Sequence, residues 1–132
     1  MSVVYQKMAL MFLVDNVDEA VSYYEQVLGA KLQYSLPQTR PFEWASLLLG
    51  GVEIMFWLKD AAQREYLYPL PISKEPANFI AYFYVDNVEA LYDQVKDRAR
   101  VLAAPKDQPY GIREFTVLDP FGFLLTFAEL KG

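Results

Sequence analysis

Two stretches of the chain share one order of hydrophobic and polar positions, and each predicts a strand that leads into a helix. Apolar residues run unbroken through Met8–Val14 and Phe79–Val85, and each run ends at an Asp-Asn pair. Short polar side chains of this kind cap helix N-termini. Apolar residues then recur at helical spacing, and Gly29 ends the first helix. The two stripes are Val17, Ala20, Val21, Tyr24 and Leu28, and Val88, Leu91, Tyr92, Val95 and Ala99.

Three short runs rich in β-forming residues follow each predicted helix. Gly50-Gly51 supplies a hairpin turn in the first half, and Asp119-Pro120-Phe121-Gly122 supplies the matching turn in the second. Each half therefore predicts a βαβββ module, and the fold class is α+β rather than a parallel doubly wound sheet. The predicted strands are Lys31–Ser35, Trp44–Leu49, Val52–Leu58, Val101–Ala103, Ile112–Leu118 and Phe123–Glu129.

The two halves also repeat each other in sequence. Val14-Asp15-Asn16-Val17-Asp18 returns as Val85-Asp86-Asn87-Val88-Glu89, an offset of 85 − 14 = 71 residues. The same offset carries Gly51 onto Gly122 and Phe56 onto Phe127. A match in one register across two elements indicates an internal duplication. We therefore expect one compact domain made of a first module (1–66), a proline-rich linker (67–77) and a second module (78–132).

Composition narrows the function classes. Apolar residues form 54% of the 132 residues, enough for a packed core, and the net charge of −5 argues against nucleic acid or anionic membranes as partners. The chain has no Cys and no His, which excludes disulfides, thiolate sites, Ser-His-Asp triads and imidazole metal ligands. The apolar run Met8–Val14 is too short for a signal peptide or a membrane span, so we expect a cytoplasmic protein.

Two motifs make the chain resemble a known family. The first is Phe12-Leu13-Val14-Asp15-Asn16-Val17 leading to Tyr23-Tyr24 and Leu28-Gly29. The second runs from Tyr110-Gly111-Ile112-Arg113-Glu114-Phe115 through Asp119-Pro120-Phe121-Gly122-Phe123-Leu124-Leu125-Thr126-Phe127. The sequence is similar to the vicinal oxygen chelate superfamily of glyoxalases, bleomycin resistance proteins and extradiol dioxygenases. The resemblance implies two modules forming a cupped eight-stranded mixed sheet around a cavity, usually completed in a homodimer.

The resemblance also implies a divalent metal held by one residue from each of four strands. The matching positions here are Ala9, Met55, Ile80 and Thr126, and only Thr126 offers an oxygen. Shifting the second position by two residues gives Glu53, but one carboxylate cannot hold a metal unaided. We therefore expect neither a metal nor another cofactor.

The positions of the missing ligands identify the cavity side of each strand, because side chains alternate between faces. That side is apolar and aromatic with a few polar groups, which is typical of a pocket for a flat organic ligand. The predicted ligand-binding residues are Met11, Trp44, Glu53, Met55, Trp57, Tyr82, Tyr84, Tyr110, Arg113 and Thr126.

Each of these residues has an alternative role. Met55 and Ile80 are as consistent with plain core packing as with a pocket wall. The two tryptophans are explained about as well by packing at a dimer interface as by stacking on a ligand. Tyr82 and Tyr84 suit strand positions with hydroxyls in water, and Glu53 suits a solvated strand end. For Arg113 a structural pair with Glu114 or Asp119 is favoured over contact with an anionic ligand. The segment Arg64–Tyr68 predicts a short amphipathic turn, more often a linker than a lid.

Three functions fit these observations. The first is a metal-free protein that sequesters a planar or aromatic compound, such as an antibiotic, in a cavity completed by a homodimer. The second is an enzyme of the same superfamily (lyase, isomerase or dioxygenase), with relocated metal ligands or with metal-free acid–base chemistry through Glu53 and Tyr82. Burial of Glu53 beside Met55, Trp57 and Tyr82 would raise its pKa and make it a candidate base. The third is a scaffold or sensor whose cavity has collapsed.

Overall fold

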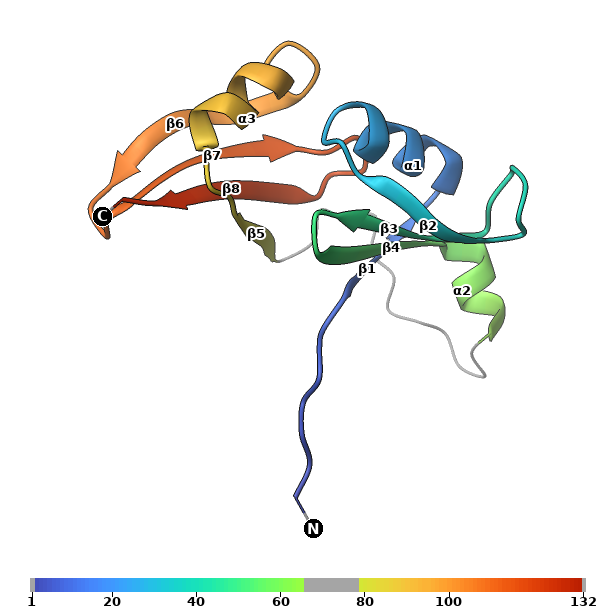
Figure 1. Ribbon diagram of the computed structural model, residues 1–132. Helices are drawn as coiled ribbons and strands as arrows, with labels where there is room; N and C mark the ends of the chain where they lie inside the picture. Colours follow the sequence, from blue (N-terminus) through green and yellow to red (C-terminus); the bar gives the residue numbers. More distant parts are fainter. Residues whose placement is uncertain (1, 66–78, 132) are drawn as a thin grey trace. The chain divides into compact units, whose positions relative to one another are not determined.

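The computed structural model describes residues 2–65 and 79–131, and the chain divides into two compact units, 1–72 and 73–132 (Figure 1). The predicted linker, 67–77, lies outside the described residues. The first unit contains β1 (Leu10–Val14), α1 (Val17–Gln26), β2 (Lys31–Leu36), β3 (Trp44–Leu49), β4 (Val52–Leu58) and α2 (Lys59–Glu65). The second contains β5 (Ile80–Tyr84), α3 (Val88–Val95), β6 (Arg100–Gln108), β7 (Ile112–Leu118) and β8 (Leu124–Leu130).

Both units have the same sheet topology. The strand orders are β1-β4-β3-β2 and β5-β8-β7-β6. The first strand of each sheet is parallel to its neighbour, and the other pairs are antiparallel. Two four-stranded mixed sheets, each carrying a strand–helix–three-strand order, confirm the predicted α+β fold of two βαβββ modules.

One helix packs on one face of each sheet, and the two cores are built alike. In the first unit α1 lies against β2, β3 and β4, and the ring of Tyr24 is 4.8 Å from that of Phe56. Phe12 stacks on the same Phe56 at 5.8 Å. In the second unit α3 lies against β6, β7 and β8, and Phe115 is 5.3 Å from Phe127. These burials follow the predicted stripes, because each helix needs an apolar partner for its apolar side.

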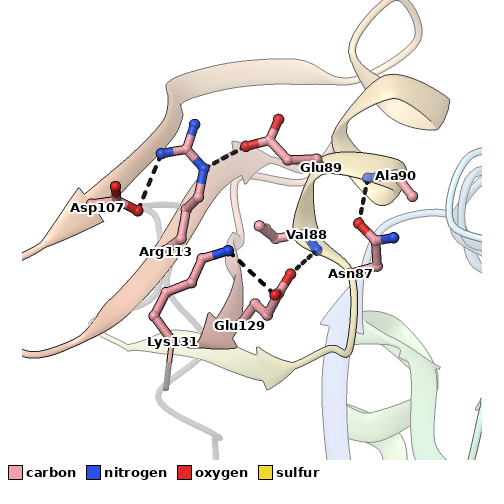
Figure 2. A network of polar contacts seen from close by, with 8 residues as sticks. All are labelled: Asn87, Val88, Glu89, Ala90, Asp107, Arg113, Glu129 and Lys131. Carbon is pink, nitrogen blue, oxygen red and sulfur yellow. Dashed lines mark hydrogen bonds and ion pairs between the residues drawn. The ribbon is translucent and has the colours of Figure 1, made fainter.

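The predicted helix caps are confirmed. The side chain of Asn16 accepts a hydrogen bond from the backbone N–H of Glu19 at 2.9 Å, and that of Asn87 accepts one from Ala90 at 3.0 Å. Such side chains satisfy N–H groups that have no partner within a helix. In Figure 2 a carboxylate oxygen of Glu129 accepts a second amide at this helix end, that of Val88, at 2.8 Å. The N-terminus of α3 is thereby tied to β8.

Several strands differ from the prediction by one or two residues at an end, and two elements differ more. Strand β6 extends over Arg100–Gln108, well beyond the expected Val101–Ala103, and it contains Pro105. Because β6 is an edge strand with a register shift between Ala103 and Lys106, the missing N–H of proline is tolerated there. The helix α2 was not predicted, although Ala61 and Ala62 are buried and suit a helix. The expected turn Arg64–Tyr68 contributes its first two residues to α2, and 66–68 lie outside the described residues.

Of the helices described, none is long and apolar enough to cross a membrane.

The Asn87 cap provides a test of this packing. Replacing Asn87 with Ala is expected to lower the free energy of unfolding by about 1 kcal/mol, because the N–H of Ala90 loses its acceptor. Urea denaturation of wild type and variant measures the difference. Gln94→Ala, an exposed change within the same helix, serves as the matched control and is expected to be close to neutral. Equal stability of the Asn87→Ala variant and wild type would contradict the assigned cap.

Candidate functional site

The candidate site residues of the first unit lie on the face of the sheet opposite α1. Phe12 and Phe56 are buried on the α1 face, and the alternating residues Met11, Met55 and Trp57 retain exposed surface. Strand register brings these residues together, because Met11 is paired with Met55 across β1 and β4. Trp57 is paired with Trp44 across β3 and β4, so two indoles and two thioethers share this face. The structure thus gathers four of the predicted ligand-binding residues.

A chain of polar contacts crosses the same face. Gln33 donates a hydrogen bond to the hydroxyl of Ser46 at 3.2 Å, and Ser46 donates to the carboxylate of Glu53 at 2.6 Å. Lys7 binds the other carboxylate oxygen at 3.2 Å. Ser46 is fully buried and Glu53 is only 18% exposed, whereas Lys7 is 77% exposed. The carboxylate is therefore held by an internal hydrogen bond on one side and by a solvated cation on the other.

These contacts determine whether Glu53 suits the role of a base. The hydrogen bond from Ser46, followed by that from Lys7, lowers the pKa of Glu53 below its ordinary value of 4.5 and outweighs the opposing effect of burial. A carboxylate stabilised in its charged form is a weak base at neutral pH. The raised pKa that burial alone would give Glu53 does not arise, because Ser46 and Lys7 stabilise its charged form.

In the second unit, two tyrosines bind one carboxylate on the face opposite α3, and a third tyrosine packs against one of them. The phenol of Tyr110 donates to one oxygen of Glu114 at 2.6 Å, and the phenol of Tyr82 donates to the other. The ring of Tyr84 meets that of Tyr82 edge to face at 5.4 Å. Burial and then the Glu114 contact raise the pKa of Tyr82, and the Glu114 hydrogen bond raises the pKa of Tyr110. Both phenols therefore remain protonated at neutral pH.

Two hydroxyl groups lie beside this cluster. The side chain of Thr126 is hydrogen-bonded to that of Thr116 at 2.7 Å, and Thr126 is 3% exposed. Thr126 is also paired in register with Tyr82 across β5 and β8. The structure thus brings the predicted residues Tyr82, Tyr84, Tyr110 and Thr126 to one face of the second sheet.

Arg113 forms structural ion pairs, but with other partners than those expected. It alternates with Glu114 along β7 and lies on the α3 face, where its guanidinium pairs with Glu89 and Asp107 (Figure 2). The distance to Asp107 is 3.2 Å. These two contacts raise the pKa of Arg113, with Glu89 the larger cause. Arg113 therefore joins α3 to the β6–β7 hairpin, and its partners are neither Glu114 nor Asp119.

Sequence reasoning did not select several residues of these networks as site residues, among them Gln33, Ser46 and Glu114. For Glu114 and Ser46, the alternation of side chains along a strand was enough to predict the face on which each lies. In the predicted strand Ile112–Leu118, Phe115 is an obvious core residue, which places Glu114 on the other face. The same reasoning, applied to Trp44–Leu49, puts Ser46 beside Trp44. Gln33 reaches Ser46 next to a register shift in β2, which no periodic pattern reveals.

A family model for the glyoxalase/bleomycin resistance protein/dioxygenase superfamily matches residues 8–127. The chain belongs to this superfamily. A crystal structure of TioX from Micromonospora sp. ML1 is similar, with a TM-score of 0.75 and 21% identity over 96% of this chain and 99% of that chain. A superfamily member from Nocardioides has a TM-score of 0.80 and 15% identity over 98% and 87% of the two chains. At such identities the likeness shows the fold alone. No curated protein matches the sequence significantly.

The divalent metal that the superfamily resemblance implies does not fit the residues present. At the four corresponding positions, Ala9 and Ile80 carry hydrocarbon, Met55 carries a thioether, and the hydroxyl of Thr126 is bonded to Thr116. Hard divalent cations need several carboxylate or carbonyl oxygens, and zinc needs imidazole, thiolate or carboxylate. Within residues 2–65 and 79–131, no three acidic side chains gather into a group that could hold a metal ion.

The lowered pKa of Glu53 provides a test of the polar chain. Ser46→Ala is expected to raise the Glu53 pKa towards 4.5, and by more than Lys7→Met does, because the Ser46 hydrogen bond is the larger cause. Carbon-detected NMR titration of the carboxyl group measures each value. With a lowered folded pKa, the contribution of Glu53 to stability is present at neutral pH and is lost as the pH falls through that value. An unchanged pKa in the Ser46→Ala variant would show that Ser46 does not donate to Glu53.

Proposed function

We propose that this chain is a metal-free small-molecule-binding protein of the superfamily and that it sequesters a planar or aromatic compound. The proposal rests above all on one observation, the composition of the face opposite α1. There Trp44 and Trp57 are cross-strand neighbours, as are Met11 and Met55. Indole rings offer large flat surfaces for stacking, and thioethers adapt to irregular ligands. Such a surface gains binding free energy by removing apolar area from water.

Fixed polar groups next to this surface support specificity. Glu53 is held in place by Ser46, which is in turn held by Gln33. A few oriented polar groups beside apolar area are what small-molecule sites use to select a ligand pose. The name of the superfamily includes bleomycin resistance proteins, which is consistent with a flat drug-like ligand for this chain.

The carboxylate chemistry favours binding over catalysis. A metal-free acid–base enzyme would use Glu53 as the base, but its hydrogen bonds lower its pKa. Tyr82 is equally unsuited to accept a proton as a phenolate, because its pKa is raised. The metal-dependent alternative would need carboxylates or carbonyls that the four ligand positions do not supply.

The proposal includes a homodimer that completes the cavity. Strand β2 is an edge of its sheet and carries the exposed apolar residues Tyr34 and Leu36. Their register partners are Ser46 and Trp44, so they extend the face opposite α1 to the sheet edge. An apolar edge of this kind is typically covered by a partner chain.

Sedimentation equilibrium is expected to show a dimer at micromolar concentration. Tyr34→Lys is expected to shift the equilibrium towards monomer, since it places a charge on the contact edge. Lys31→Ala, an exposed change on the same strand, serves as the control and is expected to leave the dimer intact. A wild-type protein that remains monomeric at high concentration would contradict this part of the proposal.

Tryptophan fluorescence tests the ligand-binding function. Titration with metal-free bleomycin and then with other planar antibiotics is expected to give saturable quenching for at least one compound. Trp57→Phe is expected to weaken that binding about tenfold, because a large stacking surface is lost. Tyr92→Phe, on the helix α3, is the control variant and is expected to bind normally. Dialysis against EDTA is expected to leave the affinity unchanged.

Two outcomes of the quenching experiment would contradict the proposed function. Absence of a response across the panel would argue against an aromatic ligand at the two tryptophans. Loss of binding after EDTA treatment would show that a metal takes part, and the metal-dependent enzyme would then become the better hypothesis.

A further inference from the structure

The cluster of Tyr82, Tyr110 and Glu114 uses its own hydrogen-bond donors internally. Each phenol proton is directed at a different oxygen of the one carboxylate. An ionised carboxylate has no donor, and a phenol has only one. What the cluster can offer a ligand is therefore acceptor lone pairs together with the faces of tyrosine rings. This combination suits a ligand that carries N–H donors and does not suit an anion.

The negative charge of Glu114 is not balanced by a basic partner in the cluster. Its two donors are neutral phenols, and the pKa of each is raised, so neither loses its proton at neutral pH. Lys106 is the cross-strand neighbour of Glu114, yet no ion pair joins the two in the described part of the chain. On the opposite face of the same strand, by contrast, Arg113 pairs with both nearby acids.

The rings around the carboxylate remain accessible. Tyr82 is 39% exposed, and Tyr84 and Tyr110 are more exposed still. Tyr82 and Tyr84 meet at an interplanar angle of 68°, so their faces form a corner beside the carboxylate. Cations bind against such faces through the ring quadrupole, and an adjacent carboxylate strengthens the attraction.

From these contacts we infer that the face opposite α3 is a binding site for an organic ammonium group, with Glu114 as its anionic partner and Tyr82, Tyr84 and Tyr110 as its aromatic wall. The inference goes beyond the proposed function, because it assigns a second binding surface, on the second unit, with a positively charged ligand and with Glu114 as its anionic group. The ammonium N–H groups bind the free lone pairs of Glu114 and of the phenol oxygens. An aromatic or aliphatic remainder of the ligand lies against the tyrosine rings.

The test uses three small probes of one shape but different charge: benzylammonium, benzyl alcohol and benzoate. Binding to isotope-labelled protein is followed by amide chemical shifts up to about 10 mM, which covers fragment affinities. Benzylammonium is expected to bind about tenfold more tightly than benzyl alcohol, and benzoate more weakly than either. The shifts are expected in β5, in β7 and around Tyr110.

Glu114→Gln removes the charge and keeps the side-chain shape, so it is expected to abolish the preference for benzylammonium over benzyl alcohol. Asp97→Asn is the matched control, because it removes one charge from an exposed position just beyond α3. It is expected to retain the preference. Tyr110→Phe keeps the ring but removes the phenol oxygen, one of the acceptors for the ammonium N–H groups, and it is expected to weaken the preference. This second variant preserves the test if Glu114→Gln does not fold.

Several results would overturn the inference. Equal affinities for benzylammonium and benzyl alcohol would remove the ammonium site but leave the proposed binding function in place. A preference that survives in Glu114→Gln would assign the charge to another group. Absence of binding by all three probes would also reject the site, while the tryptophan titration judges the proposed function independently.

Discussion

A β-strand must direct alternate side chains to opposite faces, and one face of each sheet of this protein packs against a helix, α1 in the first unit and α3 in the second. The helices α1 and α3 take up the rings of Phe12, Phe56, Phe115 and Phe127, which form the two cores. The residues in between point to the other face. They carry indoles, thioethers, phenols and carboxylates, and their contacts run along the sheet rather than into a helix. Core packing thus determines which residues are available for binding.

Alternation and capping explain why the fold could be predicted in detail. Asn16 and Asn87 follow apolar runs and precede apolar stripes, so local chemistry and the hydrophobic pattern agree at both helix starts. The strands Trp44–Leu49, Val52–Leu58 and Ile112–Leu118 were predicted with their observed bounds. The pattern failed where local signals conflicted with the tertiary position. The predicted strand Val101–Ala103 stops short of Pro105, whereas the observed edge strand β6 accommodates this proline.

The candidate site could be predicted only in part, because its chemistry depends on contacts between distant residues. Which face Tyr82 and Met55 occupy follows from the sequence, since it depends on position along a strand. The pKa of Glu53 does not, because Ser46 and Lys7 reach it from separate segments. Arg113 shows the same limit: its neighbours in sequence suggested Glu114 or Asp119 as partners, whereas the helix α3 brings Glu89. The face that a residue occupies depends on its position along the strand, whereas its partners come from segments distant in the sequence.

The duplicated architecture has a consequence for how this chain can change over generations. Trp57 and Ala128 are related by the offset of 128 − 57 = 71, and their register partners are Trp44 and Glu114. An indole in one module thus stands where the other has a carboxylate. In an assembly of identical single modules, any mutation would alter every copy of a face at once. Two modules within one gene let a mutation alter one face while the other is inherited unchanged.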